Sequence, residues 1–450
     1  NDKGSAIPYG LFYQTNGLEN TSVWHLSFVS DSVFFAAYTD LTGAVTKDAG
    51  QSWRVNLPGN DYNTTYHTLI HPLTGVLYAA VSTKHDIYQT TTVDDQLDDA
   101  SGAILKSVDG GISWEMVYNF DQPVIWLAID PTDPAVMYAS VIHSENGGIY
   151  KTHNIGEGTQ WTRLNQPEET EGHPYVVEVL NDGTVVASFS AREFPENQFT
   201  PSSGVFMSSD GGQSWEKRAH PEMDFWTKDL IINPHDSSES EWLAATFRGW
   251  GNISPTYGGL YRTRDRGFTW KEIGHFSQWV ESAIYHPDDP DILLVCTEHD
   301  GLWITYNASE ETPDFQLIED YPFAHPTRVF FNPYHPTTDI WVTSFGNGIR
   351  RSTEGVSPVT EFPSSRRTIL IYPNPTTDWL HVDVGRTEVG MSERAVFTLY
   401  LFNRLGQQVG TWRLNAVHNR IAVDQLESGI YFYRIDHPTV HLGSGKISIY

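Results

Sequence analysis

Short apolar segments recur along most of the chain, and each is bounded by Gly, Pro, Asp or Asn. The stretch 68–118 contains four of them: T-L-I-H-P, G-V-L-Y-A-A-V, G-A-I-L-K-S and S-W-E-M-V-Y. Apolar or alternating runs of this length between turn residues predict β-strands. We therefore expect this stretch to form four short strands.

The pattern recurs in seven units, and the most apolar member of each unit is its second strand. These predicted second strands are 33–39, 75–81, 136–141, 184–189, 242–247, 292–297 and 339–344. Seven such units favour an all-β fold, a seven-bladed β-propeller. The last unit has no convincing fourth strand beyond V-T-E-F (359–362), so we expect G-L-F-Y-Q (10–14) to complete it and close the ring.

A second repeat lies between the third and fourth strands. It reads S-V-D-G-G-I-S-W at 107–114, and T-K-D-A-G-Q-S-W (46–53), S-S-D-G-G-Q-S-W (208–215) and T-R-D-R-G-F-T-W (263–270) follow the same pattern. Hydroxyl and carboxylate groups can bond backbone N–H groups of their own turn, Gly permits a positive φ, and Trp can pack beneath. A calcium site would need more than one Asp per loop. We therefore predict that Asp48, Asp109, Asp210 and Asp265 are structural.

This repeat resembles the Asp-box of bacterial-neuraminidase-type (BNR) repeats. The resemblance implies a propeller blade. It does not imply one activity, because such repeats occur in sialidases, in two-propeller xyloglucanases, in sortilin-type receptors and in photosystem-assembly factors.

The pattern changes after Pro363. We expect residues 1–362 to form the propeller, 363–367 a linker and 368–450 a small immunoglobulin-like β-sandwich of short strands and Gly turns. The last segment resembles the C-terminal sorting domain of type IX secretion cargo in Bacteroidota. Four elements occur in order: Y-P-N-P (372–375), F-N-R-L-G-Q-Q-V (402–409), L-E-S-G-I-Y-F-Y (426–433) and the terminal K-I-S-I-Y.

That resemblance implies export through the periplasm to the outer-membrane surface or the medium, with residues 368–450 contacting the type IX machinery. The chain starts at Asn1 rather than Met, so we expect any signal peptide to have been removed.

Composition narrows the possible partners. The chain of 450 residues has 56 acidic and 28 basic side chains and a formal charge of −28, which argues against nucleic-acid binding. No apolar run is long enough for a membrane span. The single Cys296 excludes an intrachain disulfide. No metal-ligand spacing occurs, so we predict no metal and no cofactor.

Charged and polar candidate site residues follow the second strands, and aromatic candidates come from the loops between blades. In a propeller these two sets of loops share one face, opposite the Asp-box turns. Aromatic planes beside carboxylates suit a sugar-binding cleft, although any propeller mouth carries polar loop residues. The candidates for a ligand-binding rim are His85, His143, Arg192, Trp226, Arg248, Trp250, Trp279 and His299, with Tyr62 and Tyr66 beside them.

Catalysis is a separate hypothesis. The segment T-D-L-T-G-A-V (39–45) resembles the T-D-x-G-G segment that holds the base carboxylate of xyloglucanase-type propellers, which places Asp40 in that role, although Thr42 replaces one Gly. Glu298 or Asp300 could supply the acid within one ring. A lyase using His85, His143 and Arg192 is a further alternative. No F/Y-R-I-P segment supports a sialidase.

Three functions are consistent with these features. The first is a non-catalytic extracellular propeller that binds a glycan or a protein. The second is a glycoside hydrolase or polysaccharide lyase using the polar rim. The third is a structural subunit of a surface assembly, in which the chain could form homo-oligomers.

Overall fold

The computed structural model describes residues 21–85, 87, 98–156, 160–191, 193–194, 198–199, 203–221, 223, 226–247, 258–274, 276, 279–335, 339–352, 369–372, 376–377, 379–384, 397–404, 407–414, 418–437 and 440–449. Contacts divide the chain into two compact units, 1–357 and 358–450. All elements with described bounds are β-strands, which confirms the all-β prediction. Within the described ranges, no helix has the length and apolar character needed to span a membrane.

In the described part of the first unit, the strands form seven sheets of three or four antiparallel strands, plus the hairpin β14 (Glu193–Phe194) and β15 (Gln198–Phe199). The first three sheets are β1 (Val23–Phe28), β2 (Phe34–Tyr38) and β3 (Gly43–Thr46); β4 (Thr64–Ile70), β5 (Leu77–Ser82), β6 (Gly102–Ser107) and β7 (Glu115–Asn119); and β8 (Val124–Ile129), β9 (Met137–Val141), β10 (Gly148–Thr152) and β11 (Thr162–Arg163).

The next two sheets are β12 (Pro174–Val179), β13 (Val185–Phe189), β16 (Gly204–Ser208) and β17 (Glu216–Lys217); and β18 (Trp226–Ile232), β19 (Trp242–Phe247), β20 (Gly259–Thr263) and β21 (Lys271–Glu272). The last two are β22 (Val280–Tyr285), β23 (Leu293–Thr297), β24 (Leu302–Thr305) and β25 (Gln316–Leu317); and β26 (Pro326–Phe331), β27 (Ile340–Ser344) and β28 (Ile349–Ser352).

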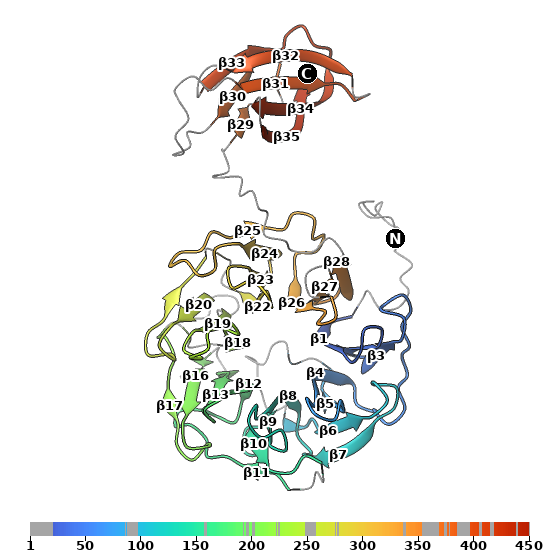
Figure 1. Ribbon diagram of the computed structural model, residues 1–450, viewed down its shortest axis with the longest axis vertical. Helices are drawn as coiled ribbons and strands as arrows, with labels where there is room; N and C mark the ends of the chain where they lie inside the picture. Colours follow the sequence, from blue (N-terminus) through green and yellow to red (C-terminus); the bar gives the residue numbers. More distant parts are fainter. Residues whose placement is uncertain are drawn as a thin grey trace. The chain divides into compact units, whose positions relative to one another are not determined.

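These sheets form a ring with the first strand of each sheet innermost (Figure 1). Neighbouring first strands contact one another all the way round, including β26 with β1. At this junction the Thr327 hydroxyl donates to the Val23 carbonyl oxygen at 3.0 Å, and Trp341 packs edge-on against Phe28 and Phe34. The ring is therefore closed by the first and last sheets. The segments 10–14 and 359–362, predicted to complete the last sheet, lie outside the described residues.

The second strands form the core of each sheet. All seven predicted second strands are present as β2, β5, β9, β13, β19, β23 and β27, and every residue in them is buried. Each lies between two strands of its own sheet and between two neighbouring sheets, which explains why these strands are mostly apolar, with only Ser and Thr among their polar residues. Cys296 belongs to β23, and burial raises the pKa of its thiol, so the thiolate is disfavoured.

The repeated turns are built from hydrogen bonds within each turn. The Ser107 hydroxyl donates to Asp109 Oδ1 at 2.7 Å and accepts from the Gly111 N–H at 2.8 Å. Asp109 accepts from the Ser113 N–H at 3.0 Å and from the Ser113 hydroxyl at 2.6 Å. The same four bonds recur in the other copies, formed by Thr46, Asp48, Gly50 and Ser52, by Ser208, Asp210, Gly212 and Ser214, and by Thr263, Asp265, Gly267 and Thr269.

The turns also join neighbouring sheets. Gly111 has a φ of 95°, and a Cβ there would lie 2.5 Å from the Phe35 ring of the preceding sheet. Trp114 packs on the same Phe35 ring, with centroids 5.0 Å apart, and its indole N–H donates to the Gly111 carbonyl oxygen. The glycine is therefore required both by the backbone conformation and by close packing between sheets.

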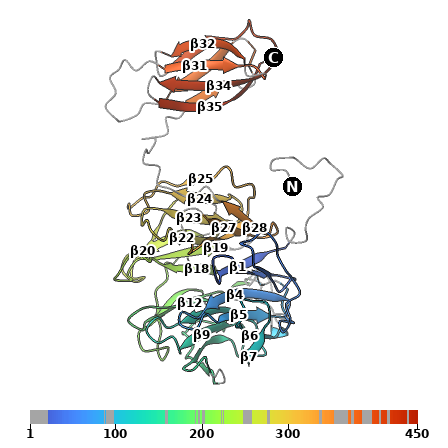
Figure 2. The same cartoon turned by 45° about the vertical axis from the view of Figure 1, so that its right-hand side comes forward.

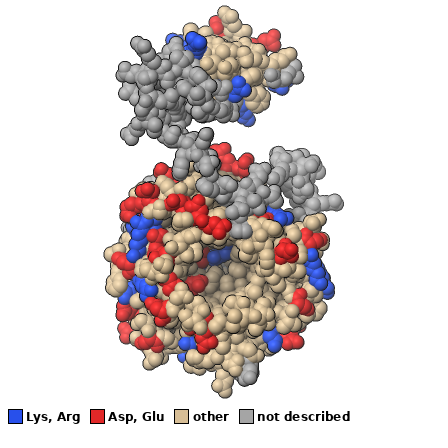
Figure 3. Space-filling model, in the orientation of Figure 1, with Lys and Arg blue, Asp and Glu red and all other residues tan. Residues whose placement is uncertain are grey.

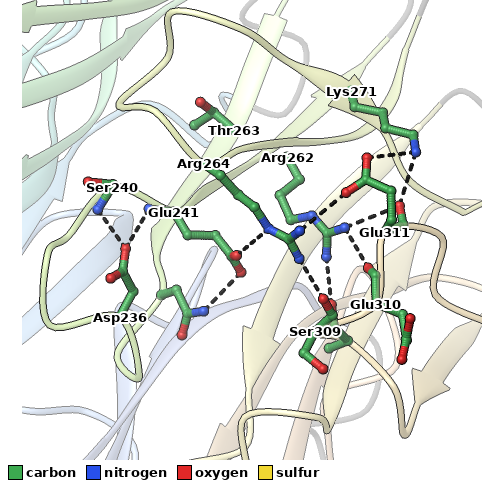
Figure 4. Close-up of polar contacts among 12 residues, drawn as sticks. Asp236, Ser240, Glu241, Arg262, Thr263, Arg264, Lys271, Ser309, Glu310 and Glu311 are labelled. Atoms are coloured by element: carbon green, nitrogen blue, oxygen red, sulfur yellow. Dashed lines mark hydrogen bonds and ion pairs between the residues drawn. The ribbon is translucent and has the colours of Figure 1, made fainter.

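Two arginines of the sheet β18–β21 bind the turn that follows β24 in the next sheet (Figure 4). This turn keeps one bond of the repeated motif, because the Thr305 hydroxyl donates to Asn307 Oδ1 at 2.6 Å. The sequence T-Y-N-A-S (305–309) stands where the motif would occur. Arg262 donates to the Ala308 and Glu310 carbonyl oxygens, each at 2.6 Å. Arg264 donates to the Ser309 carbonyl oxygen at 2.6 Å and forms an ion pair with Glu241 at 2.8 Å. The preceding sheet therefore holds this turn in place.

The second unit has one apolar core between two antiparallel sheets. The first sheet contains β29 (Ile369–Tyr372), β30 (Trp379–Val384) and β33 (His418–Ala422). The second contains β32 (Gln408–Leu414), β31 (Phe397–Phe402), β34 (Gly429–His437) and β35 (Val440–Ile449), which lie side by side in that order (Figure 2). Leucine, isoleucine and valine side chains from both sheets share the core. Residues 358–450 carry nine basic and eight acidic side chains, so the excess acid belongs to the first unit.

We predict that Asp109→Ala lowers the free energy of unfolding by about 1 kcal/mol or more at pH 7, because the turn loses its carboxylate acceptors. Burial would raise the pKa of Asp109, but the Ser113, Ser107 and Ile112 hydrogen bonds outweigh it and lower the pKa. The stabilisation that ionised Asp109 gives the fold is therefore fully present above the ordinary carboxyl pKa. It is lost as the pH falls through the lowered pKa of Asp109. Denaturant melts at pH 7 and at decreasing pH should show the difference from wild type shrinking in acid. Asp31→Ala, at an exposed carboxylate, is the control, and an equal loss in both variants would contradict the prediction.

Candidate functional site

The first strand of every sheet in the ring contains a β-bulge near its start. In β1, pairing with β2 passes from Val23 directly to His25, so Trp24 has no partner residue. The other strands show the same shift, and the residues passed over are Tyr66, Ile125, Tyr175 with Val176, Lys228, Glu281 and Thr327. A bulge bends the strand and re-aims a side chain. The ring therefore repeats one irregularity in all seven described sheets.

The bulged residues meet in one pocket. Trp24, Tyr66, Ile125, Tyr175, Lys228, Glu281 and Thr327 all line it, together with Ile87, Trp126 and Arg328. The pocket is partly open to solvent. A space-filling view shows the ring hollowed at its centre, with acidic and basic side chains visible inside (Figure 3). One residue position per sheet thus builds one central site.

The pocket belongs to the face predicted from the loops. The bulges lie near the beginnings of the first strands, and antiparallel pairing places these beside the ends of the second strands. Two hydrogen bonds connect the pocket to the loops that follow: Trp24 Nε1 donates to Thr39 Oγ1 at 2.6 Å, and the Tyr66 hydroxyl donates to the Lys84 carbonyl oxygen at 3.0 Å. The repeated turns follow the third strands and lie at the opposite ends of the sheets.

The pocket wall has an apolar half and a polar half. The sheets that begin with β1, β4, β8 and β12 contribute Trp24, Tyr66, Ile125 and Tyr175, with the Trp24 and Tyr66 ring centroids 5.4 Å apart. The sheets that begin with β18, β22 and β26 contribute the polar residues Lys228, Glu281 and Thr327. Because neighbouring sheets follow in chain order around the ring, each half is continuous.

The polar half centres on a buried ion pair. The side chains of Lys228 and Glu281 are only 5% and 1% exposed, and the Lys228 ammonium contacts the Glu281 carboxylate. His325 Nε2 lies 2.8 Å from the other Glu281 oxygen. Burial would raise the pKa of Glu281, but Lys228 and His325 outweigh it and hold the pKa below its usual value. The ammonium also lies over the rings of Trp226 (5.0 Å) and Phe247 (4.6 Å), which adds cation–π attraction.

A second ion pair lies beside the first. Arg328 donates to Asp229 Oδ1 at 2.9 Å, and its guanidinium lies 5.2 Å from the Trp126 ring centroid. Burial and the nearby Asp229 charge raise the pKa of Glu178 to about 8, so this partly accessible carboxyl group is mostly protonated at neutral pH. Burial, assisted by Arg328, lowers the pKa of His25 to about 3, so its ring is neutral.

Among the predicted catalytic residues, Asp40 lies with His85. Asp40 Oδ1 is 2.6 Å from His85 Nδ1 and accepts from Asn63 Nδ2 at 3.1 Å. Both side chains face solvent, with exposed fractions of 46% for Asp40 and 67% for His85. Asp40 has a φ of 64°, in the left-handed region, where Asp is tolerated better than most residues.

Glu298, His299 and Trp279 form another cluster. The Glu298 side chain is buried, with His299 Nε2 3.4 Å from its Oε1, and the Glu298 N–H donates to the Trp279 carbonyl oxygen at 3.0 Å. The Trp279 and His299 rings meet edge-to-face at 4.9 Å. The backbone of Asp300 accepts from Trp303 Nε1 at 3.1 Å. Three of the predicted residues are thus in direct contact.

The remaining predicted residues have different surroundings. His143 Nδ1 accepts the N–H groups of Glu145 and Asn146, so this ring stabilises its own turn. Trp226 is fully buried, and the Lys228 ammonium lies over its ring. The ring therefore does not face solvent. Arg192, Arg248 and Trp250 lie outside the described residues. No group of three or more potential metal ligands occurs in the described ranges.

The loop analysis missed Lys228, Glu281 and Arg328. A signal was present, because W-T-K-D-L-I-I, V-E-S-A-I-Y and P-T-R-V-F-F place charges inside otherwise apolar strands. A buried charge needs a partner, so three such strands indicate charges that meet in space.

Comparisons with known proteins identify the tail and the fold. Residues 370–447 match the Secretion system C-terminal sorting domain, which implies export to the cell surface or beyond. This confirms the predicted type IX sorting tail. No curated protein matches the chain in sequence.

Three solved structures share the fold at low identity. The extracellular domain of BT4673 from B. thetaiotaomicron has 14% identity and a TM-score of 0.50, covering 95% of this chain and 57% of that one. The Niastella koreensis GH74 enzyme has 12% identity and a TM-score of 0.50, covering 95% and 65%. The WD40 beta propeller domain of Doa1 has 11% identity and a TM-score of 0.50, covering 74% and 93%. The chain thus spans less than two thirds of the first two proteins, and the likeness supports a propeller fold alone.

We predict that the free energy of unfolding of Glu178→Gln increases, relative to that of the wild type, as the pH rises. The folded chain holds the Glu178 proton until about pH 8, whereas the unfolded chain releases it near pH 4.3. The stabilisation that protonated Glu178 gives the wild-type fold is therefore complete below the unfolded pKa. It is lost as the pH rises through the folded pKa. Thermal melts at pH 5 and 8.5 should show the difference growing by on the order of 2 kcal/mol. Glu145→Gln, at an exposed position, should show no such growth, and a constant difference for Glu178→Gln would refute the prediction.

Proposed function

We propose that this protein is an exported carbohydrate-binding protein whose ligand site is the central pocket. In this proposal residues 1–362 form a seven-bladed Asp-box propeller, 363–367 a linker, and 368–450 an immunoglobulin-like sorting domain. The observation that carries the proposal is the bulge in each first strand. Seven independent sheets direct the residue at one position into a single pocket, which packing of the sheets alone does not require.

The chemistry of the pocket supports a sugar ligand. Sugar rings carry C–H faces that pack on aromatic rings and hydroxyl groups that need hydrogen-bonding partners. Trp24, Tyr66 and Tyr175 supply aromatic surface, while Lys228 and Glu281 supply a donor and an acceptor. Largely apolar pockets with a few placed polar groups are typical of small-ligand sites.

The rim residues extend this site. Asp40, His85 and His299 follow the second strands β2, β5 and β23, and Trp279 directly precedes the first strand β22. Asp40 contacts His85, and Trp279 contacts His299. We propose that these residues, with His143 and the loops that contain Arg192, Arg248 and Trp250, contact the parts of a longer glycan that project from the pocket.

Binding to a polysaccharide and oligosaccharide panel, measured by calorimetry with reducing-sugar release assayed in parallel, tests the proposal. We predict that Tyr66→Ala weakens binding about tenfold or more, because it removes one aromatic wall. The control is Asp109→Ala, which destabilises the opposite end of its sheet and should leave the dissociation constant unchanged. Absence of binding across the panel, or unchanged binding by Tyr66→Ala, would overturn the proposal. Sugar release abolished by Asp40→Asn or Glu298→Gln would instead indicate a hydrolase.

We further predict that deleting residues 368–450 retains the protein inside the producing cell, because the sorting domain is removed. The retained chain should still melt cooperatively, since the ring has its own core and its own closure. Fractionation of cells and medium, with the full chain as control, measures this effect. Normal secretion of the shortened chain would contradict the assignment.

A further inference from the structure

We infer that the central pocket selects an uncharged sugar ring, held with two adjacent hydroxyl groups against Lys228 and Glu281 and its C–H face against Trp24 and Tyr66. This inference rests on the proposed function and adds the class and orientation of the ligand. It follows from the order of residues around the pocket and from the pairing of its charges.

The order of residues requires a ligand with two unlike sides. Four consecutive sheets present aromatic or aliphatic side chains to the pocket. The next three present the Lys228 ammonium, the Glu281 carboxylate, and a hydroxyl group together with the Arg328 guanidinium. A wholly apolar ligand would remove water from the ion pair without replacing its hydrogen bonds, which is costly. A wholly polar ligand would gain nothing from the aromatic half. A sugar ring has one side of each kind.

The ion pair determines which polar groups fit. The Lys228 ammonium can only donate hydrogen bonds, and the ionised Glu281 carboxylate can only accept them. A ligand touching both must accept on one side and donate on the other. A hydroxyl group does both, and two hydroxyl groups on adjacent carbon atoms can reach the two neighbouring charges together.

Charged sugars fit this arrangement poorly. A uronate carboxylate only accepts, so it would repel Glu281 while competing with it for Lys228. An amino-sugar ammonium only donates, so it would repel Lys228 in the same way. Either ligand would leave an extra charge beside a pair that is already neutral and almost fully buried.

The second ion pair adds no net charge beside the ligand. Arg328 is bonded to Asp229, so its charge is also compensated within the protein. The excess acid of the first unit adds long-range repulsion against anionic sugars. The described wall therefore offers no net charge to a ligand, and its selectivity depends on hydrogen-bond direction and aromatic contact.

The experiment compares oligosaccharides of equal length with the full chain at pH 7, by calorimetry in 0.15 M and 0.5 M salt. The probes are neutral cello-, manno- and xylo-oligosaccharides, oligogalacturonate and chitosan oligosaccharides. We expect at least one neutral probe to bind tenfold or more tightly than either charged probe at both salt concentrations. We also expect methylation of one hydroxyl of the bound diol to weaken binding about tenfold or more.

Two variants test the ion pair directly. Glu281→Gln should narrow the preference for neutral sugar over oligogalacturonate, and Lys228→Met should narrow the preference over chitosan oligosaccharides. Lys228→Met with Glu281→Gln removes both charges together, and it serves where a single change prevents folding. In that double variant the neutral sugar loses both of its charged partners, so its binding should weaken about tenfold or more.

The outcomes separate this inference from the proposed function. A charged sugar that binds most tightly, and loses binding in Tyr66→Ala, would overturn the inference while the proposed function stands. Neutral sugars that bind equally well after methylation of either hydroxyl would also overturn the inference and leave the proposed function standing. If no saccharide binds, or if the pocket captures an apolar peptide instead, both conclusions fail together.

Discussion

Face-to-face packing of small sheets around a closed ring is the constraint on which the rest of the first unit depends. A sheet of three or four short strands cannot bury both of its apolar faces alone. Each therefore packs between two neighbours, and β1 must meet β26 to cover the last exposed faces. Closure brings the seven first strands together at the centre, although bonded residues such as Val23 and Thr327 are 304 positions apart in the chain.

Convergence of the first strands explains why charges can be buried at the centre of the ring. Lys228, Glu281, Asp229 and Arg328 come from three different sheets, and each finds a partner only because those sheets meet. The carboxylates are bonded to cations and the cations lie over aromatic rings, so the cost of removing them from water is offset. A solvent-exposed rim could not hold these side chains in fixed directions, whereas the packed inner strands do.

The two units divide the work of the chain. The ring carries the excess acidic charge and the pocket, and residues 358–450 have an almost balanced charge and contain the sorting domain. Their cores are separate, since Leu380, Leu399 and Ile447 belong to a cluster formed only by the second unit. Each unit therefore has a core of its own.

Features that depend on local hydrogen bonds or on runs of apolar residues can be recognised in the sequence. The buried second strands, the turns around Asp48, Asp109, Asp210 and Asp265, and the sorting domain could all be recognised there. The rim residues named from the loops, among them Glu298 and His299, stay a prediction of a ligand site. Tertiary structure decided which residues form the pocket. A one-residue bulge changes the direction of every following side chain, and the period of apolar residues does not reveal where it falls. Trp226, which the loop pattern placed on the rim, is instead the first residue of β18, where it pairs with Phe247 and is fully buried.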